Sequence, residues 1–185
     1  MDAGEHLRKR LNPLVARMRA LEKPLLGAVN GVAAGAGANL AFACDIVIAA
    51  KSASFIEAFS KLGLIPDTGG TYFLPRLVGT ARALGMAMLG DKISAEQAAD
   101  WGLIWQCVDD AELAAVSDKL AIHFAQAPTR GLARTKQALY ASAQNTLEAQ
   151  LDLERDLMRE LGASDDYREG VAAFMAKRPP KFTGR

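Results

Sequence analysis

Residues 25–49 read LLGAVNGVAAGAGANLAFACDIVIA. This stretch contains two short apolar runs, Leu25–Val29 and Asp45–Ala49, separated by a segment of small residues. Continuous apolar runs of this length are typical of strands that are buried on both faces. Between the runs, a glycine/alanine turn over residues 31–39 leads into a helix that is predicted over residues 36–43. A strand, a helix and a second strand in this order predict a layered α/β domain.

Helical patterns lie on both sides of this unit. Apolar residues recur at helical spacing over Leu7–Leu21, where Pro13 can occupy a first turn or kink the helix. Further helices are predicted from about Gly70, with Tyr72, Phe73 and Leu77 pointing inward, and over Thr80–Leu89, Ser94–Trp101, Glu112–Ala125, Thr129–Ala143, Leu147–Leu161 and Tyr167–Ala176, with a short strand over Ile104–Val108. We expect Trp101 and Trp105 to fill the core together with Tyr72.

The composition argues against several classes of function. The chain has 185 residues and a net charge of +1, which provides no broad basic face for nucleic acid. No run approaches the ~20 apolar residues of a membrane span, and the first residues lack the apolar core of a signal peptide. We therefore expect a cytoplasmic protein without a membrane partner. Cys44 and Cys107 are too far apart for a zinc site, and no metal is expected.

A second motif, Ile65-Pro66-Asp67-Thr68-Gly69-Gly70-Thr71, places one acid just before a predicted helix. From the residues alone, Asp67 is either an ordinary cap of that helix or an acid that transfers a proton. The turn over residues 31–39 also has two interpretations, a close-packed turn or a site where backbone N–H groups meet an anion. It lacks the spacing of a nucleotide phosphate loop, because no Lys-Ser/Thr pair and no third glycine follow Gly35 and Gly37.

The stretch from Lys23 to Thr71 resembles the central signature of the enoyl-CoA hydratase/isomerase (crotonase) superfamily. Ala98–Ile104 and Asp165–Arg178 resemble further parts of the family pattern, so the resemblance covers nearly the whole chain. It implies an α/β fold, a crotonase-like spiral of ββα units truncated at its N-terminus, followed by an α-helical trimerisation region. We expect a partial core over residues 1–110 and a helical region for oligomerisation over residues 111–185.

Within the superfamily, the closest resemblance is to isomerases of phenylacetate breakdown, which act on ring-epoxidised phenylacetyl-CoA. It rests on Phe59–Asp67 and Leu151–Asp156. Hydratases of the family use two glutamates, and the positions that match them here are Asn39 and Phe59, neither of which can take a proton. One acid, Asp67, remains in the matching pocket. The resemblance therefore implies that Asp67 moves a proton from one carbon of an acyl-CoA thioester to another.

That proton transfer needs a second group. Removing a proton from carbon near a thioester places negative charge on the thioester oxygen, and a fixed N–H donor stabilises this charge. The resemblance assigns this donor to the backbone N–H of Ala36, in a turn that Gly35 and Gly37 shape. Phe59 and Ile65 are expected to form an apolar wall, which would raise the proton affinity of the acid.

Three more residues are expected at the substrate. Asn39 is expected among the substrate-binding residues, while Phe174 and Lys177 match residues that reach a neighbour's coenzyme A in assembled trimers of the family. The ring would lie near adenine and the ammonium group near phosphate, and the alternative is helix packing with a solvated lysine. The resemblance implies an acyl-CoA substrate, no cofactor besides its coenzyme A, and a homotrimer or a dimer of trimers.

Glu57 and the histidines receive smaller roles. On a strand, Glu57 would point away from Phe59, so we expect it to be structural or solvent-facing and regard it as the reserve acid. His6 and His123 are expected in a solvated or core role rather than in catalysis.

The family pattern begins before this chain does, and its earlier segment includes a loop with the other oxyanion donor. Loss of one such donor would slow the reaction by ~10²–10³-fold. We expect an understated start site or a fragment rather than a naturally short relative. The leading function is an acyl-CoA isomerase of aromatic catabolism. The alternatives are an enoyl-CoA hydratase of fatty-acid oxidation that uses Glu57, and a truncated, non-catalytic oligomerisation module.

Overall fold

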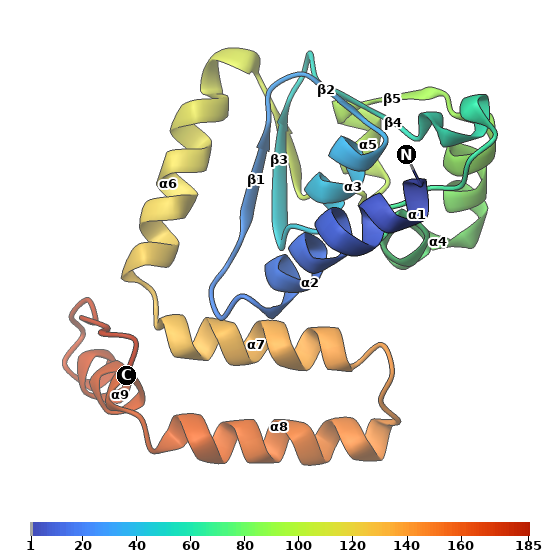
Figure 1. The fold of residues 1–185 in the computed structure, drawn as a ribbon. Coiled ribbons are helices and arrows are strands. Elements are labelled where there is room, and N and C mark those ends of the chain that lie inside the picture. The colour runs from blue at the N-terminus through green and yellow to red at the C-terminus, as the bar shows by residue number, and fades with distance from the viewer. Residues whose placement is uncertain (1) are drawn as a thin grey trace. The chain divides into compact units, whose positions relative to one another are not determined.

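The structure, a computed structural model, describes residues 2–185. Its contacts divide the chain into two compact units, which are described separately (Figure 1). The first holds residues 2–20 and Leu25–Asp118, and the second holds Leu21–Pro24 and Lys119–Arg185. The sequence predicted a boundary after residue 110, and that domain boundary stays a prediction.

Two three-stranded sheets form the centre of the first unit. The order β1-β3-β6 is parallel throughout, whereas in the order β2-β4-β5 the β2 strand is parallel and β5 antiparallel to β4. The strands are β1 Leu26–Val29, β2 Val32–Ala34, β3 Ile46–Ala50, β4 Ser54–Ile56, β5 Lys92–Ser94 and β6 Gln106–Val108. Leu26 lies opposite Ile46, and Ala49 lies opposite Cys107.

The predicted strand, helix and strand of the opening stretch are all present as β1, α3 and β3 (Figure 1). The predicted turn over residues 31–39 needs correction, because Val32–Ala34 forms a strand that pairs in parallel with Ser54–Ile56. Small side chains give a weak strand pattern, so this pairing depends on a partner elsewhere in the chain. The turn itself is confined to Gly35, whose φ is 53°.

The first unit also contains helices and single helical turns. They are α1 Ala3–His6, the π-helical turn η1 Leu7–Leu11, α2 Asn12–Ala20, α3 Ala36–Phe42, the 3₁₀ turn η2 Ala58–Leu62, α4 Gly70–Leu89, α5 Ala95–Asp100 and the 3₁₀ turn η3 Asp110–Glu112; α6, Leu113–Gln126, begins in this unit and ends in the second. The N–H of Asn12 bonds to the carbonyl of Leu7, directly before Pro13. Since a proline ring clashes with the carbonyl four residues earlier, the wider turn relieves that contact.

Apolar residues of both sheets, α3 and α4 form the core. The ring centroids of Phe42 and Phe55 are 5.3 Å apart, and Ile48, Phe73 and Leu74 are buried. The first turn of α4 therefore points Phe73 inward, as predicted.

Three other apolar side chains lie outside the core, against the sequence prediction. Tyr72 and Leu77 are exposed, and Tyr72 instead packs against Arg76, whose guanidinium carbon is 3.7 Å from the ring centroid. Trp105 is 70% exposed. It lies just before β6 and donates its backbone N–H to the carbonyl of Val47 at 2.9 Å, while its side chain stays at the surface.

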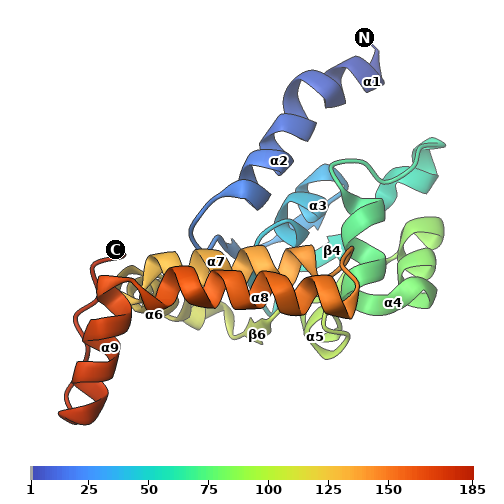
Figure 2. The ribbon, with the colours of Figure 1, turned by 90° about the horizontal axis from the view of Figure 1, so that it is seen from below.

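The second unit is helical (Figure 2). After the end of α6 it contains α7 Thr129–Ala141, α8 Leu147–Gly162 and α9 Asp165–Met175. The antiparallel helices α7 and α8 lie side by side, and Arg130 and Arg134 of α7 form ion pairs with Glu160 of α8 at 2.8 and 3.0 Å. The side chains of Thr146 and Ser164 cap α8 and α9. Within residues 2–185, no helix combines the length and the apolar character needed to cross a bilayer.

Candidate active site

Asp67 lies in the turn between η2 and α4. Its carbonyl oxygen accepts hydrogen bonds from the N–H of Gly70 at 2.8 Å and from Nδ2 of Asn39 at 3.0 Å. The residue that precedes α4 is Gly69, and it offers no side-chain cap. The carboxylate of Asp67 accepts instead from the hydroxyl of Thr68. The structure thus rules out the interpretation of Asp67 as an ordinary helix cap.

Thr68 holds the carboxylate of Asp67 from a strained backbone position. Its Oγ1 donates to Oδ1 of Asp67 at 2.7 Å, and the residue is 2% exposed. Its φ is 53°, in the left-handed region, which is uncommon for a β-branched residue. Such strain costs about 1–3 kcal/mol and persists where the surrounding structure enforces it, often at functional sites. No pattern in the sequence indicated this contact.

Asp67 lines a cavity of about 430 Å³. The other lining residues are His6, Leu7, Phe59, Leu64, Ile65 and Pro66. The structure therefore brings together Asp67, Phe59 and Ile65, which the sequence placed at one site. It also adds His6, which the sequence expected in a solvated or core role. Within the described residues, no group of three or more histidine, cysteine, aspartate or glutamate side chains could hold a metal ion.

Ala36 is the first residue of α3. The N–H of Gly35, before it, donates to the carbonyl of Ile56 at 2.8 Å. Among the described residues, the N–H of Ala36 has no hydrogen-bond partner, as expected in the first turn of a helix. Ala36 and Gly37 are not among the residues that line the Asp67 cavity. Phe59 connects the two places, because it lines the cavity and a Cβ on Gly35 would lie 3.4 Å from its Cζ.

Asn39 and Glu57 lie in the interior beside the Asp67 turn. Asn39 is fully buried, and its Nδ2 donates to the Asp67 carbonyl and, at 3.4 Å, to Oε2 of Glu57. Glu57 is only 1% exposed, so of the two predicted roles, structural or solvent-facing, the solvent-facing one is wrong. It follows β4 and precedes η2, and the strand alternation used for the prediction ends before it. Asn39 holds the turn from within, and its expected substrate contact stays a prediction.

The carboxyl group of Glu57 has a perturbed proton affinity. Burial raises its pKa to about 7 from 4.5, the hydrogen bond from Asn39 opposes this rise, and the nearby charge of Asp67 adds to it. Glu57 is therefore largely protonated below neutral pH. The site combines a neutral buried acid with a second acid that lines the cavity.

Phe174 and Lys177 belong to the second unit. Phe174 on α9 is 82% exposed and lines an apolar cavity of about 400 Å³ together with Tyr167, Val171 and Phe182. Lys177 follows α9, is exposed and has a φ of 51°. Their expected contact with coenzyme A stays a prediction.

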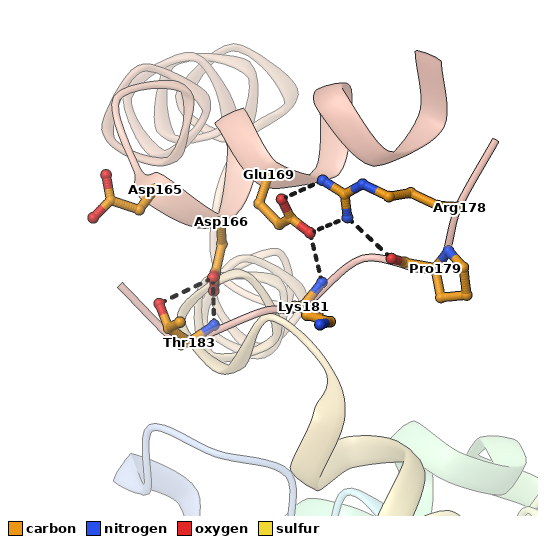
Figure 3. Close-up of a pocket in the computed structure, with 7 residues that line it drawn as sticks. All are labelled: Asp165, Asp166, Glu169, Arg178, Pro179, Lys181 and Thr183. Atoms are coloured by element: carbon orange, nitrogen blue, oxygen red, sulfur yellow. Dashed lines mark hydrogen bonds and ion pairs between the residues drawn. The ribbon is translucent and has the colours of Figure 1, made fainter. Parts of the chain in front are cut away.

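A third cavity, of about 580 Å³, lies where the last residues fold back along α9 (Figure 3). Glu169 accepts from both terminal nitrogens of Arg178 and from the N–H of Lys181, and these contacts lower its pKa to about 2. Asp166 accepts from the N–H groups of Thr183 and Gly184 at 2.7 and 2.9 Å. Two carboxylates of α9 thus hold the tail, a role that the sequence did not indicate.

Comparison with known proteins establishes the family. Residues 2–185 match the pattern of the enoyl-CoA hydratase/isomerase family. The chain belongs to this family. It is 60% identical to the 1,2-epoxyphenylacetyl-CoA isomerase of Escherichia coli, over all of this chain and 70% of that protein. It is 41% identical to the 2,3-dehydroadipyl-CoA hydratase of the same organism, over 93% of this chain and 68% of that protein.

Solved structures agree with this assignment. The enoyl-CoA hydratase of Bacillus anthracis superposes with a TM-score of 0.92 at 32% identity, over all of this chain and 72% of that one. The family and the crotonase-type α/β fold inferred from the sequence are therefore confirmed. Isomerase and hydratase names both occur among the relatives.

Proposed function

We propose that this chain is an acyl-CoA isomerase in which Asp67 moves a proton between two carbons of the acyl group. The observation that carries the proposal is the cavity that Asp67 lines, where Phe59 and Ile65 provide apolar surface. Among the described lining residues, Asp67 is the one acid. One acid beside apolar surface suits a proton shuttle, whereas the family's water addition uses an acid pair.

The proposed step needs no co-reactant. A carboxylate oxygen of Asp67 takes a proton from a carbon conjugated with the thioester, and the electron pair of the C–H bond enters an enolate whose charge rests on the thioester oxygen. The same carboxyl group returns the proton to another carbon of the conjugated system, and the double bond shifts. Protons and electrons balance between the substrate and Asp67.

The enolate oxygen needs a fixed donor, and we assign it to the N–H of Ala36. The support is the lack of a protein partner for this N–H among the described residues and its place in the first turn of α3. A donor of this kind is typically worth about 3–4 kcal/mol in the transition state. Gly35 and Gly37 keep side chains away from the approach, and Gly35 has a φ that favours glycine.

The names of the relatives support a proposal for the substrate class. The 60% identical relative carries the name 1,2-epoxyphenylacetyl-CoA isomerase, which favours an aromatic or ring-epoxide acyl-CoA as the substrate of this chain.

In the proposed assembly, the ring of Phe174 contacts the adenine of a neighbour's coenzyme A, and the ammonium group of Lys177 contacts its phosphate. Exposed apolar side chains on α9, including Phe174 and Met175, support assembly as a homotrimer or a dimer of trimers. A cytoplasmic location belongs to the same proposal.

A hydratase that uses Glu57 is the second candidate. Its pKa of about 7 suits a general acid or base, and a hydratase lies among the relatives. The burial of Glu57 argues against this candidate, because a side chain that is 1% exposed cannot contact a substrate without rearrangement. Water addition to crotonyl-CoA that survives Asp67→Asn but not Glu57→Gln would favour the hydratase.

Solvent-deuterium exchange into an unsaturated acyl-CoA tests the isomerase proposal. We expect exchange with the parent chain and a loss of at least about 100-fold with Asp67→Asn, since positioned acid–base catalysis contributes 10²–10⁴-fold. Asp91→Asn, an exposed position outside the site, is the matched control. Equal exchange by Asp67→Asn and the parent would refute the role of Asp67.

Calorimetry with the same thioester tests the third candidate, the non-catalytic oligomerisation module. A folded oligomer that binds no thioester would support that candidate.

A further inference from the structure

Asn39 and Glu57, hereafter the Asn39–Glu57 pair, join three parts of the first unit. Asn39 comes from α3, Glu57 lies between β4 and η2, and the carbonyl of Asp67 comes from the turn before α4. Nδ2 of Asn39 donates both to this carbonyl at 3.0 Å and to Oε2 of Glu57 at 3.4 Å. Both side chains are buried. A buried polar contact of this kind fixes the relative positions of its partners.

The pair contains more acceptors than donors. Oδ1 of Asn39 and Oε1 of Glu57 are both buried, and neither has a hydrogen-bond partner among the described residues. An unpartnered buried acceptor is unfavourable, and more so when it carries charge. A proton on Glu57 removes the charge and adds a donor, so the neutral acid suits this location better than the carboxylate.

The amide of Asn39 also has little room to move. A Cβ on Gly70 would lie 2.4 Å from Nδ2 of Asn39 and 2.6 Å from its Oδ1, so the amide packs directly on the backbone of the first turn of α4. Gly70 also donates its N–H to the Asp67 carbonyl. The pair is thus held against both ends of the turn that carries Asp67.

We propose that Glu57, acting through Asn39, is a positioning residue that fixes the Asp67 turn and, by remaining uncharged, keeps negative charge away from the reacting acid. This inference rests on the proposed proton transfer by Asp67. Glu57 touches no substrate in this assignment, which distinguishes it from the hydratase candidate.

Ionisation of Glu57 should make the exchange rate depend on pH. Among the described residues, Asp67 is the charged side chain whose field acts appreciably on Glu57, and Asn39 is its hydrogen-bond partner from α3. Lys61 of η2 and the backbone carbonyl of Glu57 both lie beside Gly90, because a Cβ on Gly90 would be 3.2 Å from Cε of Lys61 and 3.1 Å from that carbonyl oxygen. When Glu57 ionises above about pH 7, its charge adds to that of Asp67 and opposes the enolate, so exchange should slow.

Deuterium exchange as a function of pH provides the first test. In the parent chain, we expect the rate to fall above pH 7, whereas Glu57→Gln stays active, about threefold slower at pH 6, without that fall. Glu57→Ala should lower kcat about tenfold at an unchanged KM, because it loosens the turn. Glu96→Gln, at an exposed position, should keep the parent profile. Retention of the pH 7 inflection by Glu57→Gln would overturn the inference.

A second readout requires no turnover. In NMR of protein with ¹³C-labelled glutamate carboxyl groups, one resonance should titrate near pH 7 and disappear in Glu57→Gln. The chemical shift of the backbone amide of Thr68, which follows the Asp67 carbonyl, should change with the same pH midpoint in the parent. It should not do so in Asn39→Ala. If the chemical shift of the Thr68 amide does not change with this midpoint in the parent, positioning through Asn39 is refuted. The proposed function fails separately, if Asp67→Asn exchanges as fast as the parent.

Discussion

Nδ2 of Asn39 lies 3.0 Å from the carbonyl oxygen of Asp67, although 28 positions separate them in the chain. The bond joins the helix that begins with Ala36 to the turn that carries the proposed catalytic acid. One buried amide therefore relates the proposed oxyanion donor to the proposed base.

Replacing Asn39 should weaken the fold and the site together. In Asn39→Ala, the carbonyl of Asp67 loses one donor and Glu57 loses its hydrogen-bond partner, so we expect the free energy of unfolding to fall by about 1–3 kcal/mol. Urea denaturation at pH 6 measures this change. Asn145→Ala is the control, because Asn145 is exposed and should shift stability by less than about 0.5 kcal/mol. Equal effects of the two substitutions would contradict the structural role.

Glu57 should make stability depend on pH. Its pKa is about 7 in the folded chain and 4.5 in the unfolded chain, so the folded state binds this proton more tightly. The stabilisation is complete below pH 4.5 and is lost as pH rises to about 7, a change of about 3 kcal/mol at ~1.4 kcal/mol per pH unit.

The comparison with Glu57→Gln isolates this contribution, since all other groups titrate in both proteins. The difference in unfolding free energy between parent and variant should shift in favour of the variant by about 3 kcal/mol between pH 4.5 and 7.5. Denaturant titrations at four pH values would provide it. A constant difference across this range would mean that Glu57 does not hold the proton.

Gly70 should not tolerate a methyl group. A Cβ there would meet the amide of Asn39 at 2.4 Å, so Gly70→Ala should destabilise the fold by about 1–3 kcal/mol and displace the Asp67 turn. Gly85→Ala is the matched control, because Gly85 lies in the same helix and a methyl group there would meet no atom within 4 Å. That control should gain about 0.5–1 kcal/mol from better helix propensity. Thermal unfolding of both variants decides the prediction, which fails if they shift in the same direction.

Asp166 should control release of the C-terminal residues. It accepts from the N–H groups of Thr183 and Gly184 and is 6% exposed, whereas its neighbour Asp165 is exposed. Asp166→Ala should free the residues after Lys181, whose N–H stays bonded to Glu169. Carboxypeptidase should then remove residues 182–185 at least about tenfold faster, because local opening sets access to the protease. Carboxypeptidase should digest Asp165→Ala at the same rate as the parent. Mass spectrometry of timed digests would settle the comparison.

The sequence predicted those features that depend on neighbours in the chain. The β1, α3 and β3 unit and the end of α4 at Leu89 both follow from local patterns. The short strands β2, β4 and β5 did not follow, because three residues carry little periodicity and their pairing comes from distant segments.

In the candidate site, too, some features were predicted from the sequence and others depend on the tertiary fold. Asp67, Phe59 and Ile65 were placed at one site by family resemblance, and they line one cavity. The burial of Glu57 was missed, because strand alternation does not continue past β4. Proximity of His6 to Asp67 in that cavity depends on the tertiary fold, and no spacing in the sequence indicates it.

The folded-back tail has a practical consequence for labelling. The N–H of Asp166 donates to the carbonyl of Arg185 at 3.0 Å, so a fluorophore attached after Arg185 would start beside the first turn of α9 and not on a loose arm. Its anisotropy would report on the tumbling of the helical unit. Emission from such a dye could follow events at Tyr167, Val171 and Phe174 on the same helix without any cysteine being introduced there.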